Sequence, residues 1–352
     1  GRTIPVGIDL GTTNCVLAYV DAEGQSHLIR DSFDKATIPS AVSMTPDGLL
    51  CGREALAQLN LAPENVARDF KRDMGSAHAS CTLAGRSLPP EVLQAYLLRY
   101  LRSQIEQAIG IDYHAVITVP AYFDEVRRQK TLRAAEMAEL PTISILNEPT
   151  AAALAFGKRL GMLHSSGAPC KQRNVLVYDL GGGTFDVTVV RLSPDECVTL
   201  ATDGDMCLGG NDWDLRLQEY ALEQLFRERP ELAPWDENQD HRLRAAVVRA
   251  KHSLSSTTDT TLTWRQRDRM YSLSVSRETF EKVTRDLMER TMFTTRSVLR
   301  DAGVGWTDIV SLVLVGGATR LPVVSRKLLN LSGLQPERSV SPDEAVGRGA
   351  AI

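Results

Sequence analysis

The stretches GIDLGTTNCVLAYV at residues 7–20 and YDLGGGTFDVTVVRL at residues 178–192 contain nearly the same pattern twice. Each begins with an apolar strand that ends in Asp-Leu-Gly, continues through a run of Gly and Thr, and returns as a second strand. Glycines in such a turn allow backbone amides to approach an anion closely. The pattern therefore predicts two copies of a phosphate-binding hairpin, which face each other and hold a polyphosphate between two lobes.

The duplication extends beyond the hairpins. AVITVPAY at 115–122 matches SLVLVGGA at 311–318, each read as a buried strand, a tight turn and a helix. EPTAAALAFG at 148–157 pairs more weakly with SPDEAVGRGAAI at 341–352. The pairs follow one order along the chain, which indicates an internal repeat with a larger insertion in its second copy.

Composition indicates a globular protein. The 352 residues predict two to three domains, which fits two lobes with insertions. Hydrophobic residues make up 43% of the chain and charged residues 24%, within the usual globular range. The net charge is −4 and no basic stripe stands out, which disfavours nucleic-acid binding.

The chain carries no sign of a secreted or membrane protein. Its six cysteines are scattered, without a C-x-x-C pair or metal-ligand spacing, which predicts a reduced, cytoplasmic compartment. No apolar run is long enough for a membrane helix, and no signal-peptide pattern is present. Because the first residue is Gly1 and not Met, we expect a trimmed start.

Residues 1–165 are predicted to form the first lobe, a mostly parallel sheet covered by helices. The expected strands are 4–10, 14–20, 115–119 and 142–146, and the expected helices are 90–109, 124–139 and 149–160. Residues 33–85 break this pattern and are interpreted as an inserted subdomain.

Residues 166–352 are predicted to form the second lobe, after a crossing segment at 161–173 that is rich in Gly, Ser and Pro. The expected strands are the hairpin 174–192, 197–203, a pair within 258–275 around a charged turn at 265–269, and 310–315. The expected helices are 211–228, 239–254 and a long helix at 276–302. Residues 205–285 would be the larger insertion.

Nine motifs together cover the chain from end to end. In order they are GIDLGTTN, TIPSAVSM, FKRDMGS, VITVPAYF, NEPTAAALAFG, YDLGGGTFDVTVV, GDMCLGGNDWD, LVLVGGATRLP and SPDEAV. The chain thereby resembles the ATPase domain of the DnaK-type chaperones, the seventy-kilodalton heat-shock family. The resemblance implies an α/β, actin-like ATPase fold: two duplicated lobes with ribonuclease H-like sheets and a central nucleotide cleft. The short first insertion and the TLTW strand are most similar to the HscC-like bacterial branch.

The resemblance assigns the phosphate end of this cleft. Asp9 and Asp179 could be simple turn formers after strands, but the family uses them to hold Mg²⁺ through bound water. K⁺ is a further candidate cation. The implied contacts to ATP or ADP at this end are Gly11, Thr12, Thr13, Asn14, Gly181, Gly182, Gly183, Thr184, Asp186, Gly209 and Gly210.

Two further residues gain a catalytic role from the resemblance, in addition to Thr184, Asp9 and Asp179. Lys71 lies in a charge-mixed stretch where a lysine is usually a solvated surface group, but the family's lysine at this place stabilises charge on the γ-phosphate. Glu148 could serve only as an acidic residue at a helix N-terminus. The resemblance makes it the carboxylate that orients or deprotonates the attacking water.

The adenosine end departs from the family pattern. Its implied contacts are Lys251, His252, Ser255, Gly316, Gly317, Arg320 and Asp343. Val248 stands where the family usually has Glu, His252 where it has Arg, and Asn211 where it has an acid. We therefore expect weaker nucleotide binding than is typical. If His252 stacks on adenine as a cation, ADP should bind more tightly at about pH 6 than at about pH 8.

The resemblance implies an ATPase switch that controls peptide binding elsewhere in a longer protein. Pro120 and Arg128 match positions that link the two activities. The expected partners are a J-domain co-chaperone, a nucleotide exchange factor and unfolded peptides, and the expected state is a monomer. The peptide-binding domain is expected to be absent because the chain stops at Ile352. Alternatives within this fold are a sugar kinase and an actin-like filament protein.

Overall fold

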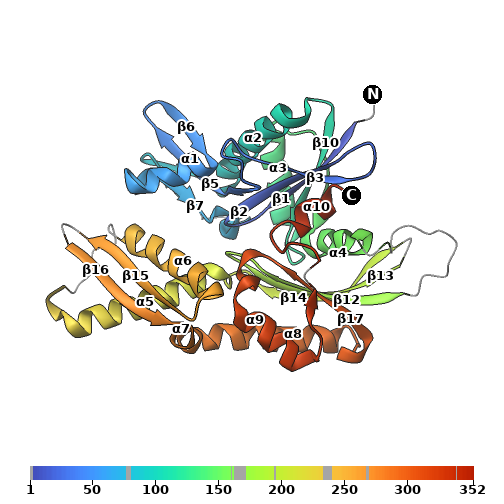
Figure 1. The fold of residues 1–352 in the computed structure, drawn as a ribbon. Coiled ribbons are helices and arrows are strands. Elements are labelled where there is room, and N and C mark those ends of the chain that lie inside the picture. Colours follow the sequence, from blue (N-terminus) through green and yellow to red (C-terminus); the bar gives the residue numbers. More distant parts are fainter. Residues whose placement is uncertain are drawn as a thin grey trace.

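The computed structural model describes residues 3–76, 81–159, 161, 172–193, 196–232, 240–266, 269–337 and 339–352. Its two large sheets lie in two lobes, one above the other in the view of Figure 1. The first sheet has the strand order β11-β10-β1-β2-β3, with β4 paired to β2, and the second has the order β14-β13-β12-β17-β18.

The first lobe is built on a sheet whose strands come from both ends of the predicted unit. These strands are β1 (Ile4–Leu10), β2 (Asn14–Val20), β3 (Ser26–Ile29), β4 (Thr37–Pro39), β10 (Tyr113–Val119) and β11 (Thr142–Asn147). Its helices are α2 (Pro90–Ile109), α3 (Glu125–Met137) and α4 (Glu148–Arg159). The inserted part contains β5 (Ala41–Thr45), β6 (Gly48–Cys51), α1 (Gly52–Ala57), β7 (Val66–Arg68), β8 (Cys81–Leu83) and β9 (Arg86–Leu88).

The second lobe repeats this plan with a larger insertion. Its sheet consists of β12 (Arg173–Leu180), β13 (Phe185–Leu192), β14 (Cys197–Asp205), β17 (Ile309–Val315) and β18 (Pro336–Glu337). The insertion contains α5 (Gly210–Glu228), α6 (Asp240–Ser256), β15 (Asp259–Gln266), β16 (Arg269–Ser276) and α7 (Arg277–Val283). The remaining helices are α8 (Arg285–Asp301), α9 (Pro322–Ser332) and α10 (Ala345–Ala350).

Sheet pairing shows that the two halves have the same topology. β1 pairs antiparallel with β2 and parallel with β10, and β12 pairs in the same ways with β13 and β17. Ile8 lies opposite Ile117, and Tyr178 lies opposite Leu314. Ile117 of β10 and Leu314 of β17 therefore hold equivalent places in the two sheets and are 197 residues apart in the chain. The sequence alignment of AVITVPAY with SLVLVGGA is one residue out of register with this pairing.

Two helices pack across the predicted boundary at residues 165 and 166. α4 packs on β12 and β13 of the second sheet, whereas α10, from the end of the chain, packs on β1 and β2 of the first sheet. The two helices cross so closely that a Cβ added to Gly349 would lie 1.7 Å from the carbonyl oxygen of Ala151. Each half therefore supplies a helix to the other, and the boundary remains a sequence-based division.

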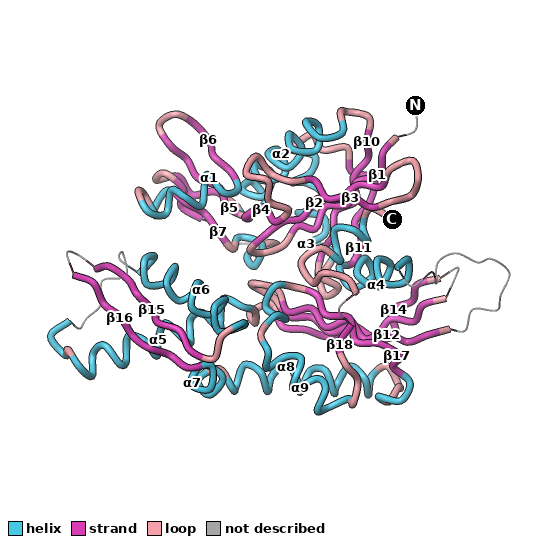
Figure 2. Tube along the Cα trace, in the orientation of Figure 1, coloured by secondary structure: helices cyan, strands magenta, loops and turns pink. Residues whose placement is uncertain are grey.

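Helices cover both faces of each sheet, as Figure 2 shows. On the outer faces, α2 and α3 accompany the first sheet, and α8 and α9 the second. The apolar layer between the sheets combines α4 and α10 with strands of the second sheet. Burial on both faces explains the nearly continuous apolar runs that predicted these strands. Among the described helices, none is both long and apolar enough to span a membrane.

Two predicted elements differ from the structure. The helix expected at 276–302 is two helices, because Thr284 ends α7 and precedes α8 with non-helical backbone angles. Its buried hydroxyl donates to the carbonyl of Phe280 at 2.8 Å, and its amide donates to the same carbonyl at 3.1 Å. Of the turn expected at 265–269, residues 265 and 266 belong to β15 and residue 269 to β16, whereas residues 267 and 268 lie outside the described residues.

Candidate functional site

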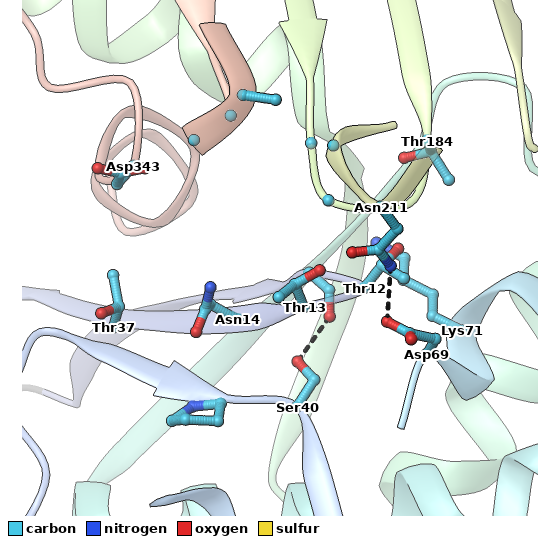
Figure 3. Close-up of a pocket in the computed structure, with 18 of the residues that line it drawn as sticks. Thr12, Thr13, Asn14, Thr37, Ser40, Asp69, Lys71, Thr184, Asn211 and Asp343 are labelled. Carbon is cyan, nitrogen blue, oxygen red and sulfur yellow. Dashed lines mark hydrogen bonds between the residues drawn. The ribbon is translucent and has the colours of Figure 1, made fainter. Parts of the chain in front are cut away.

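A cleft of about 310 Å³ lies between the lobes and is lined by both hairpin loops. Figure 3 shows Thr12, Thr13 and Asn14 on one side, facing Thr184 and Asp343 on the other. The predicted residues that line it are Asp9, Gly11, Thr12, Thr13, Asn14, Lys71, Glu148, Asp179, Gly181, Gly182, Thr184, Gly210, Lys251, His252, Gly316, Gly317 and Asp343. The predicted residues outside this lining are Gly183, Asp186, Gly209, Ser255 and Arg320.

The two hairpin loops touch each other, and glycine is required where they meet. A Cβ added to Gly182 would lie 1.8 Å from Oγ1 of Thr13, and one added to Gly183 would lie 2.4 Å from Cγ2 of Thr12. Gly209 fits equally closely, because its added Cβ would lie 2.6 Å from the backbone of Gly183. Gly183 and Gly209 thus shape the cleft through backbone contacts although they do not line it.

Ser40 fastens the first loop to the TIPSAVSM segment. Its hydroxyl donates to the carbonyl of Gly11 at 2.7 Å, and its amide donates to the carbonyl of Thr13 at 2.9 Å (Figure 3). These bonds fix the loop against the segment that contains Ser40. In the sequence this segment was identified only as a family motif, and no role was predicted for Ser40.

A buried ion pair lies in the cleft. Nζ of Lys71 donates to Oε1 of Glu148 at 2.8 Å, and both side chains are more than nine-tenths buried. Burial disfavours the charged ammonium, but the Glu148 carboxylate more than offsets this and raises the pKa of Lys71. Lys71 comes from a short 3₁₀ helix and Glu148 from the start of α4. Two predicted catalytic residues are therefore in contact.

Three aspartates lie around this pair, of which Asp179 and Asp186 are buried and Asp9 is partly buried. Burial raises the pKa of Asp9 to about 7, the Glu148 carboxylate adds to the increase, and Lys71 partly reverses it. Burial, followed by Glu148 and Asp9, raises the pKa of Asp179 well above its usual range. Burial and Asp179 do the same for Asp186, whose two carboxylate oxygens lack hydrogen-bond partners among the described residues.

This excess of negative charge fits a hydrated cation. Asp9, Asp179, Asp186 and Glu148 carry four carboxylates against the single ammonium of Lys71. In the described part of the chain, no group of three or more His, Cys, Asp or Glu residues is arranged to hold a metal ion. Mg²⁺ commonly keeps several of its waters and uses only one or two carboxylates, so the donor set suits Mg²⁺ bound through water.

Charged residues bridge the two insertions above the loops. Oδ1 of Asp69 accepts from the Asn211 amide at 3.0 Å (Figure 3), and its Oδ2 accepts from Arg244 at 3.2 Å. Arg72 donates to Asp212 at 2.9 Å and to the carbonyl of Gly183 at 2.7 Å. Of these bridging residues, only Asn211 was singled out from the sequence. The only signal was the mixed charge around Lys71, which does not reveal a partner far along the chain.

At the other end of the cleft, Lys251 already has partners. Its buried ammonium donates to Asp214 at 2.8 Å and to the carbonyl of Gly210 at 2.9 Å, and Ser255 donates to its carbonyl at 3.4 Å. Val248 and His252 line the cleft from the same helix, α6. Burial, followed by the charge of Lys251, lowers the pKa of His252.

The turn after β17 completes the lining. Gly316 has a φ of +85°, and an added Cβ would lie 2.3 Å from the carbonyl oxygen of Leu180. Glycine is therefore required by both its backbone angle and the space available. Arg320 does not line the cleft, but it donates at 2.5 Å to Asp343, which does. A cleft of this size, lined by glycines and by charged side chains, suits a small charged ligand.

The comparison with protein families decides which family has this arrangement. A family model described as Hsp70 protein matches residues 5–83 and 76–352. The chain belongs to the Hsp70 family. The predicted family and the predicted actin-like ATPase fold class are thereby confirmed. The finer assignment to the HscC-like branch stays a prediction.

Curated relatives of this Hsp70 chain carry chaperone names. The chain is 38% identical over 356 residues to the chaperone protein DnaK of Thermotoga petrophila and 38% identical over 372 residues to the chaperone protein HscA homolog of Bordetella petrii. It is 37% identical over 354 residues to the chaperone protein DnaK of Halobacterium salinarum. These alignments cover 99%, 100% and 99% of the chain but 58%, 58% and 55% of the relatives. The Hsp70 chain thus spans somewhat more than half of their length.

Proposed function

We propose that this chain is the nucleotide-binding part of a DnaK-type chaperone and that it hydrolyses ATP to ADP and phosphate. The observation that carries the proposal is the buried Lys71–Glu148 pair in a cleft between two phosphate-loop hairpins. The phosphates of bound ATP would lie between residues 12–14 and residues 181–184, whose backbone amides suit an anion.

In this proposal the residues around the cleft have separate chemical roles. Lys71 stabilises negative charge that develops on the γ-phosphate, and Glu148 orients the attacking water and accepts its proton. The short contact between their side chains keeps both groups in place before ATP enters. Asp9 and Asp179 would hold hydrated Mg²⁺, which supplies charge neutralisation on the phosphates. Thr184 follows the glycine run, where it would respond to the γ-phosphate. K⁺ is a second candidate for the carboxylate-rich region.

Partners are proposed from the relatives' names and from the resemblance. We assign to the full-length protein a J-domain co-chaperone, a nucleotide exchange factor and unfolded peptide clients, in a cytoplasmic, monomeric protein. Coupling to a peptide-binding domain would pass through Pro120 and Arg128. Arg128 supports this route because it donates to Oδ1 of Asn147 at 2.5 Å, and Asn147 directly precedes Glu148.

The experiment that tests the proposal is single-turnover ATP hydrolysis by wild type and Lys71→Ala. We expect hydrolysis to fall about 10²- to 10³-fold, because one electrostatic transition-state contact is removed. ATP binding, measured by calorimetry, should change far less, since the ammonium acts mainly in the transition state. The exposed Lys282→Ala on α7 is the matched control.

Hydrolysis by Lys71→Ala within a few-fold of wild type would contradict the role of Lys71. Transfer of phosphate from ATP to a sugar by the wild type would favour the kinase alternative instead. Nucleotide-dependent sedimentation of polymers would favour the filament alternative. The same preparation serves all three measurements, so the outcomes can be compared directly.

A further inference from the structure

A second cavity adjoins the nucleotide cleft at the bridge between the insertions. Its volume is about 490 Å³, and it is lined by the first insertion, by α5 and by the start of α6. Arg68, Asp69, Asn211, Asp214 and Arg244 line both this cavity and the cleft. Asp69 accepts hydrogen bonds from Asn211 and Arg244, so a polar bridge lies where the two spaces adjoin.

Three arginines and three aspartates line this second cavity, but one of the arginines has no carboxylate partner among the described residues. Arg68, Arg72 and Arg244 all line it. Arg72 is paired with Asp212, and Arg244 with Asp69, whereas no carboxylate lies within ion-pair distance of Arg68 in the described part of the chain.

The remaining charged groups do not cancel the charge of Arg68. Asp214, the third carboxylate of the lining, is paired with Lys251 at 2.8 Å. Burial, followed by repulsion from Arg244, lowers the pKa of the Arg68 guanidinium, which shows that its surroundings disfavour an added positive charge. A guanidinium remains charged at any pH that proteins tolerate. An anion beside Arg68 would therefore supply the charge partner that its guanidinium lacks among the described residues.

His241 supplies an unused hydrogen-bond donor at the same cavity. Both its ring nitrogens are shielded from solvent, and neither has a hydrogen-bond partner among the described residues. Buried polar atoms in proteins nearly always have a partner, so an atom without one requires an explanation. A neutral imidazole carries one N–H, which an oxyanion could accept.

We propose that this cavity binds inorganic phosphate. Arg68 would hold two phosphate oxygens with its planar, two-pronged donor set, and His241 would donate to a third. Because the cavity adjoins the cleft and shares five lining residues with it, the phosphate would come from ATP hydrolysis in that cleft. This source rests on the proposed function, whereas phosphate binding itself does not.

Phosphate titration of the chain loaded with Mg²⁺ and a non-hydrolysable ATP analogue tests the site, because the analogue fills the γ-phosphate position. We expect one phosphate per chain by calorimetry, and about tenfold weaker binding in Arg68→Gln because a charge-assisted contact is lost. His241→Ala should weaken binding less. Arg249→Gln, an exposed arginine on the same helix as Arg244, should bind like wild type.

Undetectable phosphate binding, or equal binding by wild type and Arg68→Gln, would overturn the proposal. A second measurement separates it from the proposed function. A fluorescent phosphate sensor should report altered phosphate release in His241→Ala, whose side chain lines the second cavity but not the cleft, while hydrolysis measured by quenching stays at the wild-type rate. Normal hydrolysis without phosphate binding would reject this site alone. Absence of hydrolysis in the wild type would reject the proposed function and leave the titration to decide on the cavity.

Discussion

The two phosphate-loop hairpins share a backbone plan but carry different side chains. Asp9 lies opposite Val16 in the first hairpin, whereas Asp179 lies opposite Asp186 in the second. The first loop carries threonines where the second carries glycines, and Thr13 occupies the space that a side chain at position 182 would need. A duplicated scaffold can therefore acquire complementary surfaces, because its copies face each other across one cleft.

The difference continues in the groups around the hairpins. The first half supplies Lys71 and Glu148, and α4 begins at Glu148. The corresponding helix of the second half, α10, is preceded by Glu344, which pairs with Arg348 at 3.0 Å and is partly exposed. The same residue type at the start of a matching helix thus has a different environment. Catalytic asymmetry arises from the surroundings and not from the repeat.

Replacement of the two glutamates gives the largest expected contrast. Glu148→Gln should slow hydrolysis about 10²- to 10⁴-fold, because the group that accepts a proton from water is lost. Glu344→Gln should leave the rate near that of wild type. Single-turnover hydrolysis at saturating ATP measures both, and equal effects of the two changes would show that position within the repeat, and not burial beside Lys71, sets the role.

The crowded aspartates predict an unusual pH dependence for the protein without metal and nucleotide. Folding raises the pKa of Asp9 from 3.8 to about 7, so the folded state binds this proton more tightly than the unfolded chain does. The resulting contribution to the unfolding free energy is complete below about pH 4 and is lost as pH rises through about 7. Asp179 and Asp186 shift in the same direction.

We therefore expect the free energy of unfolding, measured with urea in the presence of EDTA, to be on the order of 3 kcal/mol lower at pH 8 than at pH 5. Asp9→Asn should reduce this difference and raise the unfolding free energy at pH 8, as should added Mg²⁺ in the wild type. The exposed Asp47→Asn is the control. Unfolding that becomes harder from pH 5 to pH 8 would contradict the sign.

Two glycines of the second loop test how closely the hairpins fit. Gly182→Ala should lower the unfolding free energy by about 1–3 kcal/mol, because its Cβ would overlap Thr13, and should weaken ATP binding. Gly181→Ala should be tolerated, since its nearest contact would be 3.6 Å away. Adding Thr13→Gly to Gly182→Ala should restore part of the stability. Identical losses for both alanines would show that the loops do not touch as described.

The adenosine end should give the smallest effect. Val248→Glu on α6 should tighten ADP binding by up to about tenfold, because a carboxylate could accept from the ribose hydroxyls. Arg249→Glu on the exposed side of α6 is the control. Because the pKa of His252 is lowered, a smaller fraction of it is protonated at pH 6 than of an ordinary histidine. Calorimetry should therefore show a smaller difference in ADP affinity between pH 6 and 8 than the sequence analysis expected.

Local patterns in the sequence predicted much of the secondary structure. The helix expected at 90–109 is α2, because its apolar residues follow helical spacing and Gly110 ends it with a positive φ. The expected helix at 276–302 was wrong in one place, at Thr284, where the backbone angles are not helical. Hydrophobic spacing reports which face of a helix is buried. It does not report a single residue at which the backbone leaves helical angles.

The residues alone were enough to predict the repeated hairpins, the two-lobed α/β architecture and the family, because these depend on short motifs in a set order. Tertiary structure decided which distant groups meet. The exchange of α4 and α10, the contact of Lys71 with Glu148, and the bridge from Asp69 to Asn211 all join segments far apart in the chain. A pKa such as that of Asp9 depends on burial by those segments. Periodicity marks an apolar or polar face, but only packing selects the partner that covers it.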